Sequence, residues 1–515
     1  MNGIPSTPNP FAFIQARLGS TRLPNKILSN FPFPNEPETT VLDHIFKRLS
    51  KLLPSDQIIF LIPDSDFILR DKLKEKGYSV FLGSESDVLD RFSRCANFYE
   101  ADHIFRLTGD NPFLDLNSIE LLWEAMFHIR NPLYCIAMSG LPLGMGVEAF
   151  SRETLKAKPD SGWLPYHKEH VSLHAKENPN QFQIKKFSPP FLSDEDQLLS
   201  ASIRMTLDEP SDLKLLDIIW QYFKDSSPFF GVKELLQFYL KNPNNFEINK
   251  NVEQVKFDLP KPKNSSTNLG ILYGKPEKLG YGHFVRCQSL SIELQSQNWN
   301  VRLSDTSEKF KEMDKIIVDA RDTIEASKSS IFIDRGKKDY YFLPHPDSLG
   351  SKNYFYSSPI LEWFLSSKKS IIKKNQTILY LGNLDIHQTK MILAMIPKNR
   401  ELIQIGGQRI NDDSKYYPRL TKIEYYRLLK ESDEMITYYG QSCFEAMYLD
   451  KAVALFSMTD DHEMLANYAN KEFGVSNWGR IPNLTYSKPM KPFFIPQRNA
   501  QKNLIQSINE EFNSY

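Results

Sequence analysis

A basic segment near the start of the chain carries residue types that bind phosphate. Residues 15–26 read Gln-Ala-Arg-Leu-Gly-Ser-Thr-Arg-Leu-Pro-Asn-Lys. Arg17 and Arg22 can make bidentate charge-assisted bonds to phosphate oxygens, and Lys26 adds a mobile positive charge. Backbone N–H groups around Gly19 can donate to the same oxygens. The segment predicts a triphosphate cradle without the Gly-Lys-Ser/Thr ending of a P-loop ATPase, and the alternative is a solvated basic turn.

Two aspartates far apart in the sequence could hold a divalent cation. Asp110 stands in residues 106–112, Arg-Leu-Thr-Gly-Asp-Asn-Pro, at the end of an expected strand, where α/β sheets place ligands. Asp208 stands in Thr-Leu-Asp-Glu-Pro-Ser-Asp-Leu. Mg²⁺ is usually held by one or two carboxylates together with phosphate oxygens and waters, so the pair predicts a magnesium site. In the alternative interpretation Asp110 caps a turn, and Asp208 or Ser211 caps a helix that begins near Asp212.

A third candidate lies in the second half of the chain. Residues 278–287 read Lys-Leu-Gly-Tyr-Gly-His-Phe-Val-Arg-Cys, and their glycines let the backbone approach a ligand closely. His283 stands at the start of an expected helix that runs to about Gln295, where the positive helix end favours a neutral imidazole that can accept a proton. The alternative is an aromatic-glycine turn whose histidine caps the helix.

The elements that must position these residues follow an α/β rhythm. In the first half, short apolar runs alternate with the amphipathic stretches Val41–Leu53 and Phe67–Lys76, as in a parallel sheet covered by helices. The apolar runs of the first half are 11–15, 58–62, 80–82 and 104–107. Those of the second half are 269–273, 316–319, 331–334, 377–381, 402–405, 435–438 and 453–456.

A polar segment separates the two halves. Residues 241–268 are rich in Pro, Asn and Ser and have weak periodicity. We therefore expect a domain over residues 1–245, a linker over 246–268 and a second region over 269–515. The halves share no repeat and indicate two different α/β domains.

Length and charge exclude several classes of protein. The 515 residues exceed what one core usually organises, and 63 basic residues balance 63 acidic ones, so no global field attracts nucleic acid or a membrane surface. No run of about 18 apolar residues predicts a membrane span. The four cysteines, Cys95, Cys135, Cys287 and Cys443, have no paired metal spacing, and no secretion signal precedes them. We expect a cytoplasmic protein.

Six segments of the first half together resemble a known family. They are 15–26, Gly83–Arg91, Arg106–Pro112, Gly146–Phe150, Lys168–Val171 and Leu207–Leu213. In this order, over about residues 10–225, they resemble the spore-coat polysaccharide cytidylyltransferase-like family, which is related to the enzymes that make CMP-Kdo and CMP-sialic acid. The resemblance implies a Rossmann-like nucleotidyltransferase fold of the nucleotide-diphospho-sugar transferase kind.

That resemblance also implies a reaction and a set of site residues. CTP would lie over the switch point of the sheet, and an acidic sugar would attack its α-phosphorus and release pyrophosphate. The implied residues are Arg17, Arg22, Lys26 and Asp110 for catalysis, Gln15, Ala16, Gly19 and Ser20 for the nucleotide, Asp110 and Asp208 for Mg²⁺, and Glu148 and His170 for the sugar. Glu148 and His170 could instead be structural. Dimerisation is an expectation borrowed from these relatives.

The same family places three residues at the wall of its nucleotide site. They are Asp87, Asp90 and Arg91. A helix N-cap at Ser86, with Asp90 as an exposed first-turn acid, explains them nearly as well.

The second half resembles another family over about residues 269–480. Gly280–Cys287 is similar to a signature of the UDP-sugar hydrolase of pseudaminic acid synthesis, a GT-B-like family. Matching segments follow at 317–322, 333–336, 380–385 and 439–446. The resemblance implies a UDP-sugar ligand, His283 as proton acceptor, and Gly282, Gly440, Ser442 and Glu445 at the nucleotide. A glycine-started helix without a ligand would look similar.

This second half departs from its family at three places. Gly382-Asn383-Leu384-Asp385 and Gly440-Gln441 replace glycine pairs, and Asp461-His462 replaces Asn-Gln. Side chains then occupy space that bare backbone should leave open to phosphate. The departures leave the expectation of a GT-B-like fold and weaken the expectation of hydrolysis.

The leading hypothesis is a magnesium-dependent cytidylyltransferase. It would activate an acidic sugar of the nonulosonic acid type with CTP, for surface polysaccharide or glycan biosynthesis, and carry a degenerate hydrolase-like second half. One alternative is a non-catalytic sugar-nucleotide-binding or scaffold protein. The other is a cytidylyltransferase for a phosphorylated polyol.

Overall fold

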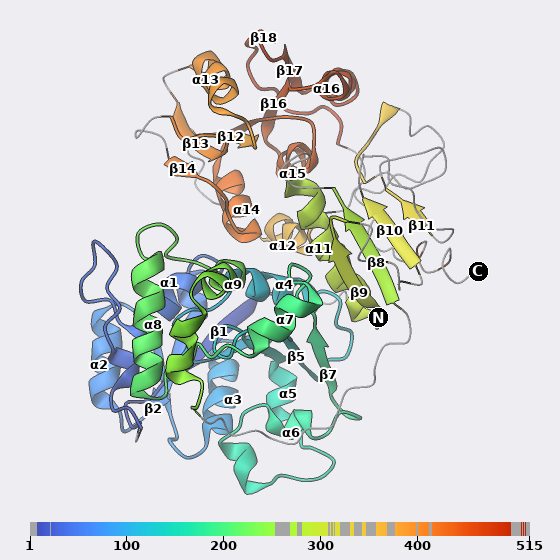
Figure 1. Ribbon diagram of the computed structural model, residues 1–515. Coiled ribbons are helices and arrows are strands. Elements are labelled where there is room, and N and C mark those ends of the chain that lie inside the picture. Colours follow the sequence, from blue (N-terminus) through green and yellow to red (C-terminus); the bar gives the residue numbers. More distant parts are fainter. Residues whose placement is uncertain are drawn as a thin grey trace. The chain divides into compact units, whose positions relative to one another are not determined.

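The computed structural model describes most of the chain in two units. The described residues are 8–20, 22–252, 268–274, 281–306, 310, 313, 315–319, 330–333, 342–346, 357–367, 376–397, 400–410, 415–495, 506, 508 and 510. The amino-terminal unit is Met1–Asn264 and the carboxy-terminal unit is Ser265–Tyr515. Figure 1 shows their elements.

The amino-terminal unit contains a seven-stranded sheet of order β3-β2-β1-β4-β6-β5-β7. Its strands are β1 (Pro10–Gln15), β2 (Ile58–Pro63), β3 (Ser79–Gly83), β4 (His103–Thr108), β5 (Tyr134–Met138), β6 (Glu148–Ser151) and β7 (Gln183–Phe187). β1 pairs in parallel with both β2 and β4, so the strand order reverses beside β1. In open α/β sheets such a switch point is where ligands bind.

Helices alternate with these strands as the sequence predicts. They are α1 (Val41–Leu49), α2 (Phe67–Glu75), α3 (Val88–Phe98), α4 (Leu116–Met126), α5 (Arg152–Lys156), α6 (Leu173–Lys176), α7 (Asp194–Ala201), α8 (Pro210–Phe223) and α9 (Val232–Lys241). The short 3-10 helices include η1 (Lys26–Leu28), η3 (Pro165–Lys168) and η4 (Pro243–Asn249). β2 is buried at every position, as a parallel strand covered on both faces must be.

Two expectations for this unit are wrong in detail. The sheet is not all parallel, because β6 runs antiparallel to β4 and to β5. α1 ends at Leu49 and not at Leu53, since the N–H groups of Leu52 and Leu53 both turn back to the Leu49 carbonyl. Both leucines are buried, so the apolar pattern continues past the helix.

The carboxy-terminal unit contains two sheets. A four-stranded parallel sheet has the order β11-β10-β8-β9, and a seven-stranded sheet has the order β14-β13-β12-β15-β16-β17-β18, in which only β17 and β18 pair antiparallel. The first comprises β8 (Asn268–Tyr273), β9 (Asn300–Ser304), β10 (Lys315–Asp319) and β11 (Ser330–Phe332). The second comprises β12 (Gln376–Gly382), β13 (Glu401–Gly406), β14 (Lys415–Tyr417), β15 (Glu434–Thr437), β16 (Ala452–Ser457), β17 (Ser476–Arg480) and β18 (Asn483–Leu484).

The helices of this unit follow the same alternation. They are α11 (Tyr281–Ser296), α12 (Pro359–Ser366), α13 (Ile386–Met395), α14 (Lys422–Glu431), α15 (Gln441–Tyr448) and α16 (Asp460–Phe473). Apolar residues of β8, β10 and α11, such as Ile271, Ile317 and Leu290, form one buried core. Ile436 and Trp478 belong to another, under the second sheet.

The boundary between the units falls inside the predicted linker, between Asn264 and Ser265. The first residues of that linker are folded, because 246–249 belong to η4, and Asn249 Nδ2 lies 2.9 Å from Asp212 Oδ1 of α8. Residues 253–267 lie outside the described residues. Among the described helices, none is long and apolar enough to cross a membrane.

Candidate functional site

The loops that follow β1 and β4 touch at the switch point. The N–H of Gly109 donates to the carbonyl of Gln15 over 2.8 Å. A Cβ on Gly109 would lie 3.0 Å from the Cβ of Ala16, so glycine permits this close approach. A third segment joins them, because the N–H of Leu207 donates to the carbonyl of Asp110 over 2.9 Å.

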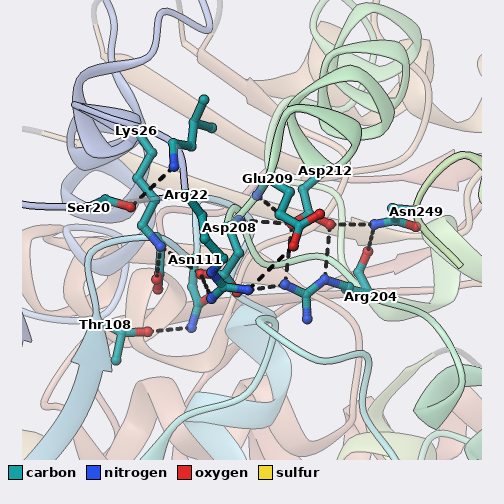
Figure 2. Close-up of polar contacts among 12 residues, drawn as sticks. Ser20, Arg22, Lys26, Thr108, Asn111, Arg204, Asp208, Glu209, Asp212 and Asn249 are labelled. Carbon is teal, nitrogen blue, oxygen red and sulfur yellow. Dashed lines mark hydrogen bonds and ion pairs between the residues drawn. The ribbon is translucent and has the colours of Figure 1, made fainter. Parts of the chain in front are cut away.

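This meeting of loops brings the two predicted carboxylates to one cation. Lys26 Nζ lies 2.6 Å from Asp110 Oδ2 and 2.8 Å from Asp208 Oδ1. Arg22 Nη2 lies 3.1 Å from the same Asp208 oxygen, although half of the arginine side chain is exposed. Figure 2 shows Lys26 and Arg22 reaching into this cluster. Burial opposes ionisation of Asp208, but Lys26, Arg204 and Arg22 together lower its pKa.

The carboxylate oxygens of Asp110 and Asp208 on Lys26 are of the kind that a hard cation prefers, and two further polar oxygens on these loops have no hydrogen-bond partner. Asn111 follows Asp110 directly; its Nδ2 donates to Thr108 Oγ1, and its buried Oδ1 has no hydrogen-bond partner. Gln15 Oε1, at the end of β1, is also buried and unpartnered. Within the described ranges no cluster of three or more His, Cys, Asp or Glu suits a metal, so phosphate oxygens would have to complete the coordination.

The helix cap beside Asp208 differs from both predicted alternatives. α8 begins at Pro210 with Glu209 as its N-cap, and neither Asp208 nor Ser211 has that role. Asp212 Oδ2 instead accepts from the N–H groups of Asp208 and Glu209, at 2.9 and 3.0 Å. Asp212 therefore accepts the N–H groups before the helix, and the carboxylate of Asp208 is left to contact Lys26 and Arg204.

The rest of the basic segment is more open. Ser20 Oγ accepts from the N–H of Leu23 at 3.5 Å (Figure 2), and no heavy atom lies within 4 Å of a Cβ built on Gly19. Arg17 is exposed. Burial of Arg91 on α3 lowers the pKa of Arg91, and the positive charge of Arg17 lowers it further. Thr21 lies outside the described residues.

The N-cap of α3 is Asp87 and not Ser86. Asp87 Oδ1 accepts from the N–H of Asp90 at 3.0 Å, while Ser84 Oγ accepts from the N–H of Asp87. Arg91, one turn further on, is 2% exposed, and its Nε and Nη1 have no hydrogen-bond partner. Asp90 is exposed, as the structural alternative predicts.

Glu148, a predicted sugar contact, is already paired. Its Oε2 accepts from Arg106 Nη1 at 3.2 Å and from Ser172 Oγ at 2.7 Å, and Lys176 Nζ contacts Oε1. Burial would raise the pKa of Glu148, but Lys176 and Arg106 lower it to about 2. His170 is half-buried in the turn between η3 and α6, where its backbone N–H donates to the Tyr166 carbonyl. Neither Arg106 nor Lys176 was predicted from the sequence as part of this site.

In the carboxy-terminal unit, His283 is held by a buried carboxylate. His283 Nδ1 lies 2.8 Å from Asp319 Oδ1, at the end of β10. Arg286 binds both oxygens of Asp319, and Cys287 Sγ lies 3.2 Å from Oδ2. Burial would raise the pKa of Asp319, but Arg286 and then His283 hold it well below its usual range. His283 therefore contacts the same carboxylate, that of Asp319, as Arg286 and Cys287, which lie one turn further along α11.

A cavity in the same unit is lined by three of the four predicted nucleotide residues; its described lining does not include Gly440. Gly282 lines it together with Ser442 and Glu445 of α15; the described lining does not include His283. Gly440 is the N-cap of α15, as predicted. Glu445 Oε1 accepts from Tyr426 at 2.8 Å and Gln441 at 3.1 Å, and burial raises its pKa to about 7.

The departures from the glycine motifs have structural counterparts. Asp385 caps α13, and Asn383 lines the cavity. Gly382 and Gly406 both have positive φ, and a Cβ on Gly406 would lie 2.5 Å from the Gly382 carbonyl oxygen. This close approach was not predicted from the sequence, although the glycine pair at 406–407 could have indicated it. Of the second-half motifs, Gly280, 320–322 and 334–336 lie outside the described residues.

Comparisons with known proteins match the amino-terminal unit. The family model described as cytidylyltransferase matches residues 11–255. An uncharacterized protein of Methanocaldococcus jannaschii is 33% identical over 247 residues, which are 47% of this chain and 96% of the relative. The spore coat polysaccharide biosynthesis protein SpsF of Bacillus subtilis is 29% identical over 240 residues, 45% of this chain and 93% of that protein. The solved structure of a cytidylyltransferase from Leptospira borgpetersenii is 28% identical, covers 48% of this chain and 100% of its own, and has a TM-score of 0.41.

Proposed function

The chain belongs to the cytidylyltransferase family through its amino-terminal half, and from this premise we propose that this half is a magnesium-dependent CMP-sugar synthetase. Its acceptor would be an acidic sugar of the nonulosonic acid type, and its product would serve surface polysaccharide or glycan biosynthesis. The observation that supports this most is the convergence of Asp110 and Asp208 on one cation beside a basic loop at the switch point. The similarity to SpsF supports the polysaccharide context.

The proposed chemistry rests mainly on positioning and charge. Arg17, Arg22 and Lys26 would hold the triphosphate of CTP, with the backbone at Gly19 and Ser20 donating to the same oxygens. Gln15 and Ala16 would lie beneath the nucleotide at the end of β1. Asp110 and Asp208 would hold the magnesium ion, which neutralises charge on the phosphates when bound. The acceptor oxygen then attacks the α-phosphorus, and pyrophosphate leaves from the opposite side.

The acceptor site would lie around Glu148 and His170. Because Glu148 already binds Arg106 and Lys176, one positive charge of this cluster remains unbalanced. An excess positive charge suits an acceptor that carries a carboxylate. We therefore keep Glu148 and His170 as proposed contacts and add Arg106 and Lys176 as the groups that would meet the acid.

The test is release of pyrophosphate from CTP and Mg²⁺ with a panel of acidic sugars. We expect turnover with at least one acidic sugar and its loss in Asp110→Asn and Arg22→Ala. Folded protein that turns over no acidic sugar would overturn the proposal. Turnover with a phosphorylated polyol alone would favour that acceptor class, and CTP binding without any turnover would favour a sugar-nucleotide-binding protein. Dimerisation, borrowed from relatives, is checked by light scattering.

For the carboxy-terminal half we propose a GT-B-like region, between domain limits of about 269 and 515, that binds a UDP-sugar. The supporting observation is a cavity that places Gly282 near Ser442 and Glu445. Glu445 would accept from ribose hydroxyls, Gly440 would open the helix toward the diphosphate, and His283, held by Asp319, would accept a proton. Calorimetry with UDP tests binding, and comparison of wild type with His283→Ala tests hydrolysis. Background hydrolysis in both would leave binding alone.

A further inference from the structure

The two oxygens of Asp208 have different partners. Oδ1 faces Lys26 Nζ at 2.8 Å and Arg22 Nη2 at 3.1 Å, on the side of Asp110. Oδ2 accepts instead from Arg204 Nη2 at 2.6 Å. Figure 2 shows Arg204 and Lys26 on opposite sides of this carboxylate. Arg204 therefore holds one oxygen of Asp208, and the other oxygen faces Lys26 and Arg22.

Arg204 is itself fixed by a buried acid. Its Nε lies 2.9 Å from Asp212 Oδ1 and its Nη2 lies 3.2 Å from Asp212 Oδ2, and 10% of its side chain is exposed. Asp212 is fully buried and also accepts from Asn249 Nδ2 and from two N–H groups at the start of α8. Every oxygen of Asp212 is thus occupied, so neither it nor the guanidinium can turn without breaking buried bonds.

From this arrangement we propose that Arg204 is a positioning residue that reserves a single oxygen of Asp208, Oδ1, for the divalent cation. The inference rests on the proposed function, because it concerns the metal of cytidylyl transfer. A planar guanidinium donates in fixed directions and so fixes the orientation of the two carboxylates that it bridges, whereas the donors of an ammonium group rotate freely. Asp212 balances the charge of Arg204, so the negative charge of Asp208 stays available to the site. Partners of this kind behind a metal ligand set its orientation and its affinity.

The experiment compares two buried arginines of the same unit. Arg48 donates only to the backbone carbonyls of Leu114, Pro228 and Phe230, so Arg48→Lys is the matched control for Arg204→Lys. Binding of Mn²⁺ is measured by electron paramagnetic resonance in the presence of a non-hydrolysable CTP analogue, and thermal unfolding is measured on the same samples. We expect Arg204→Lys to weaken Mn²⁺ binding about tenfold or more. Arg48→Lys should lower the melting temperature and leave Mn²⁺ binding unchanged.

A second variant separates positioning from folding. Arg204 lines a cavity together with Tyr239, Phe246 and Lys250, so a small cation can reach the space that Arg204→Ala leaves. We expect millimolar guanidinium to restore part of the Mn²⁺ affinity of Arg204→Ala and to do nothing for Arg48→Ala. If Arg204→Ala does not fold, Arg204→Lys decides alone, and folded Arg204→Lys with wild-type Mn²⁺ affinity would overturn the inference.

Failure of the inference and failure of the proposed function look different. Wild-type protein that binds no Mn²⁺ with the CTP analogue, and turns over no acceptor, contradicts the proposed function and with it the inference. Wild-type binding combined with equal binding by the folded Arg204 variants contradicts the inference alone.

Discussion

Asp208 in the amino-terminal unit and Asp319 in the carboxy-terminal unit are both bound by an arginine, but they differ in what else reaches them. Asp208 gives one oxygen to Arg204 and the other to the partly exposed side chains of Lys26 and Arg22. Asp319 is fully buried and has both oxygens on Arg286, with His283 as a further partner. The first acid can exchange a lysine for another cation. The second can act only through the histidine that it orients.

The two glutamates of the candidate sites differ in the same way. Glu148 lies between Arg106 and Lys176 and has a pKa lowered to about 2. Glu445 is enclosed by tyrosines and Gln441, and burial raises its pKa to about 7. Partners with full charge keep a carboxylate ionised, whereas neutral hydrogen-bond donors do not outweigh the loss of water. Glu148 is therefore held in its ionised form, whereas burial disfavours the ionised form of Glu445.

Asp319→Asn is the largest test of this contrast. It leaves Arg286 buried without its carboxylate, and breaking a buried pair costs about 3–5 kcal/mol of unfolding free energy. We expect the calorimetric transition of the carboxy-terminal unit to fall steeply while pyrophosphate release from CTP stays unchanged. An unchanged transition would show that the pair contributes little. Asp385→Asn, an exposed helix cap, is the control.

Asp208→Asn should have the opposite profile. Loss of one of the two carboxylates proposed to hold Mg²⁺ should lower the rate of pyrophosphate release about 10²–10³-fold, measured at saturating CTP and Mg²⁺. The thermal transition should change little, because Asn can still accept from Arg204. Exposed Asp225→Asn, after the end of α8, should leave both the rate and the transition unchanged. A near-normal rate in Asp208→Asn would remove Asp208 from the reaction.

Glu445→Gln tests whether burial disfavours the ionised form of Glu445. The folded-state pKa of about 7 lies above the ordinary value of 4.5, so the stability from protonated Glu445 is full below about pH 4.5 and is lost as pH rises through 7. The difference corresponds to about 3 kcal/mol at most. In urea unfolding of the wild-type protein, the carboxy-terminal unit should lose stability between about pH 4.5 and 7, within about that limit. Glu445→Gln should flatten this loss; an equal slope in both proteins would contradict the buried-acid assignment.

Glu148→Gln should give a smaller effect of opposite sign. The pKa of Glu148 lies near 2, below its ordinary value, so its stabilisation is present above about pH 4.5 and is lost as pH falls through 2. We expect about 2 kcal/mol, because the side chain is partly exposed. Urea unfolding of wild type and Glu148→Gln should converge toward pH 2 and diverge above pH 5. Parallel curves would show that Lys176 and Arg106 do not stabilise the ionised form of Glu148 over its protonated form.

Local pattern was sufficient for much of the fold and for part of the site. The strands around Phe11–Gln15 and Ile104–Leu107 follow from short apolar runs, and the basic loop and Asp110 follow from their position at strand ends. The pairing of Asp319 with His283 could not be predicted, because it depends on β8 and β10 being neighbours in the sheet. The antiparallel β6 is only four residues long, too short to show its direction in a pattern.

The contacts between side chains were the hardest part of the structure to predict from the sequence. Arg204 stands four residues before Asp208 in an irregular segment, where no periodicity indicates that they meet. Capping residues were misplaced by one or two positions, at Asp87 and Glu209, since several neighbouring acids and hydroxyls can serve. The role of Lys26 toward phosphate stays a prediction, and its observed contact with two acids arises only because three separate loops meet.

The position of Lys26 between Asp110 and Asp208 has a consequence for the order of ligand entry. Lys26 is an internal counterion for both carboxylates, so a divalent ion would have to compete with its ammonium group for the same two oxygens. The phosphates of a nucleotide would give that ammonium group new anionic partners. The ammonium group could then leave the two carboxylates free for the metal. We expect metal and nucleotide to assist each other's entry, and by thermodynamic reciprocity each strengthens the other by the same factor.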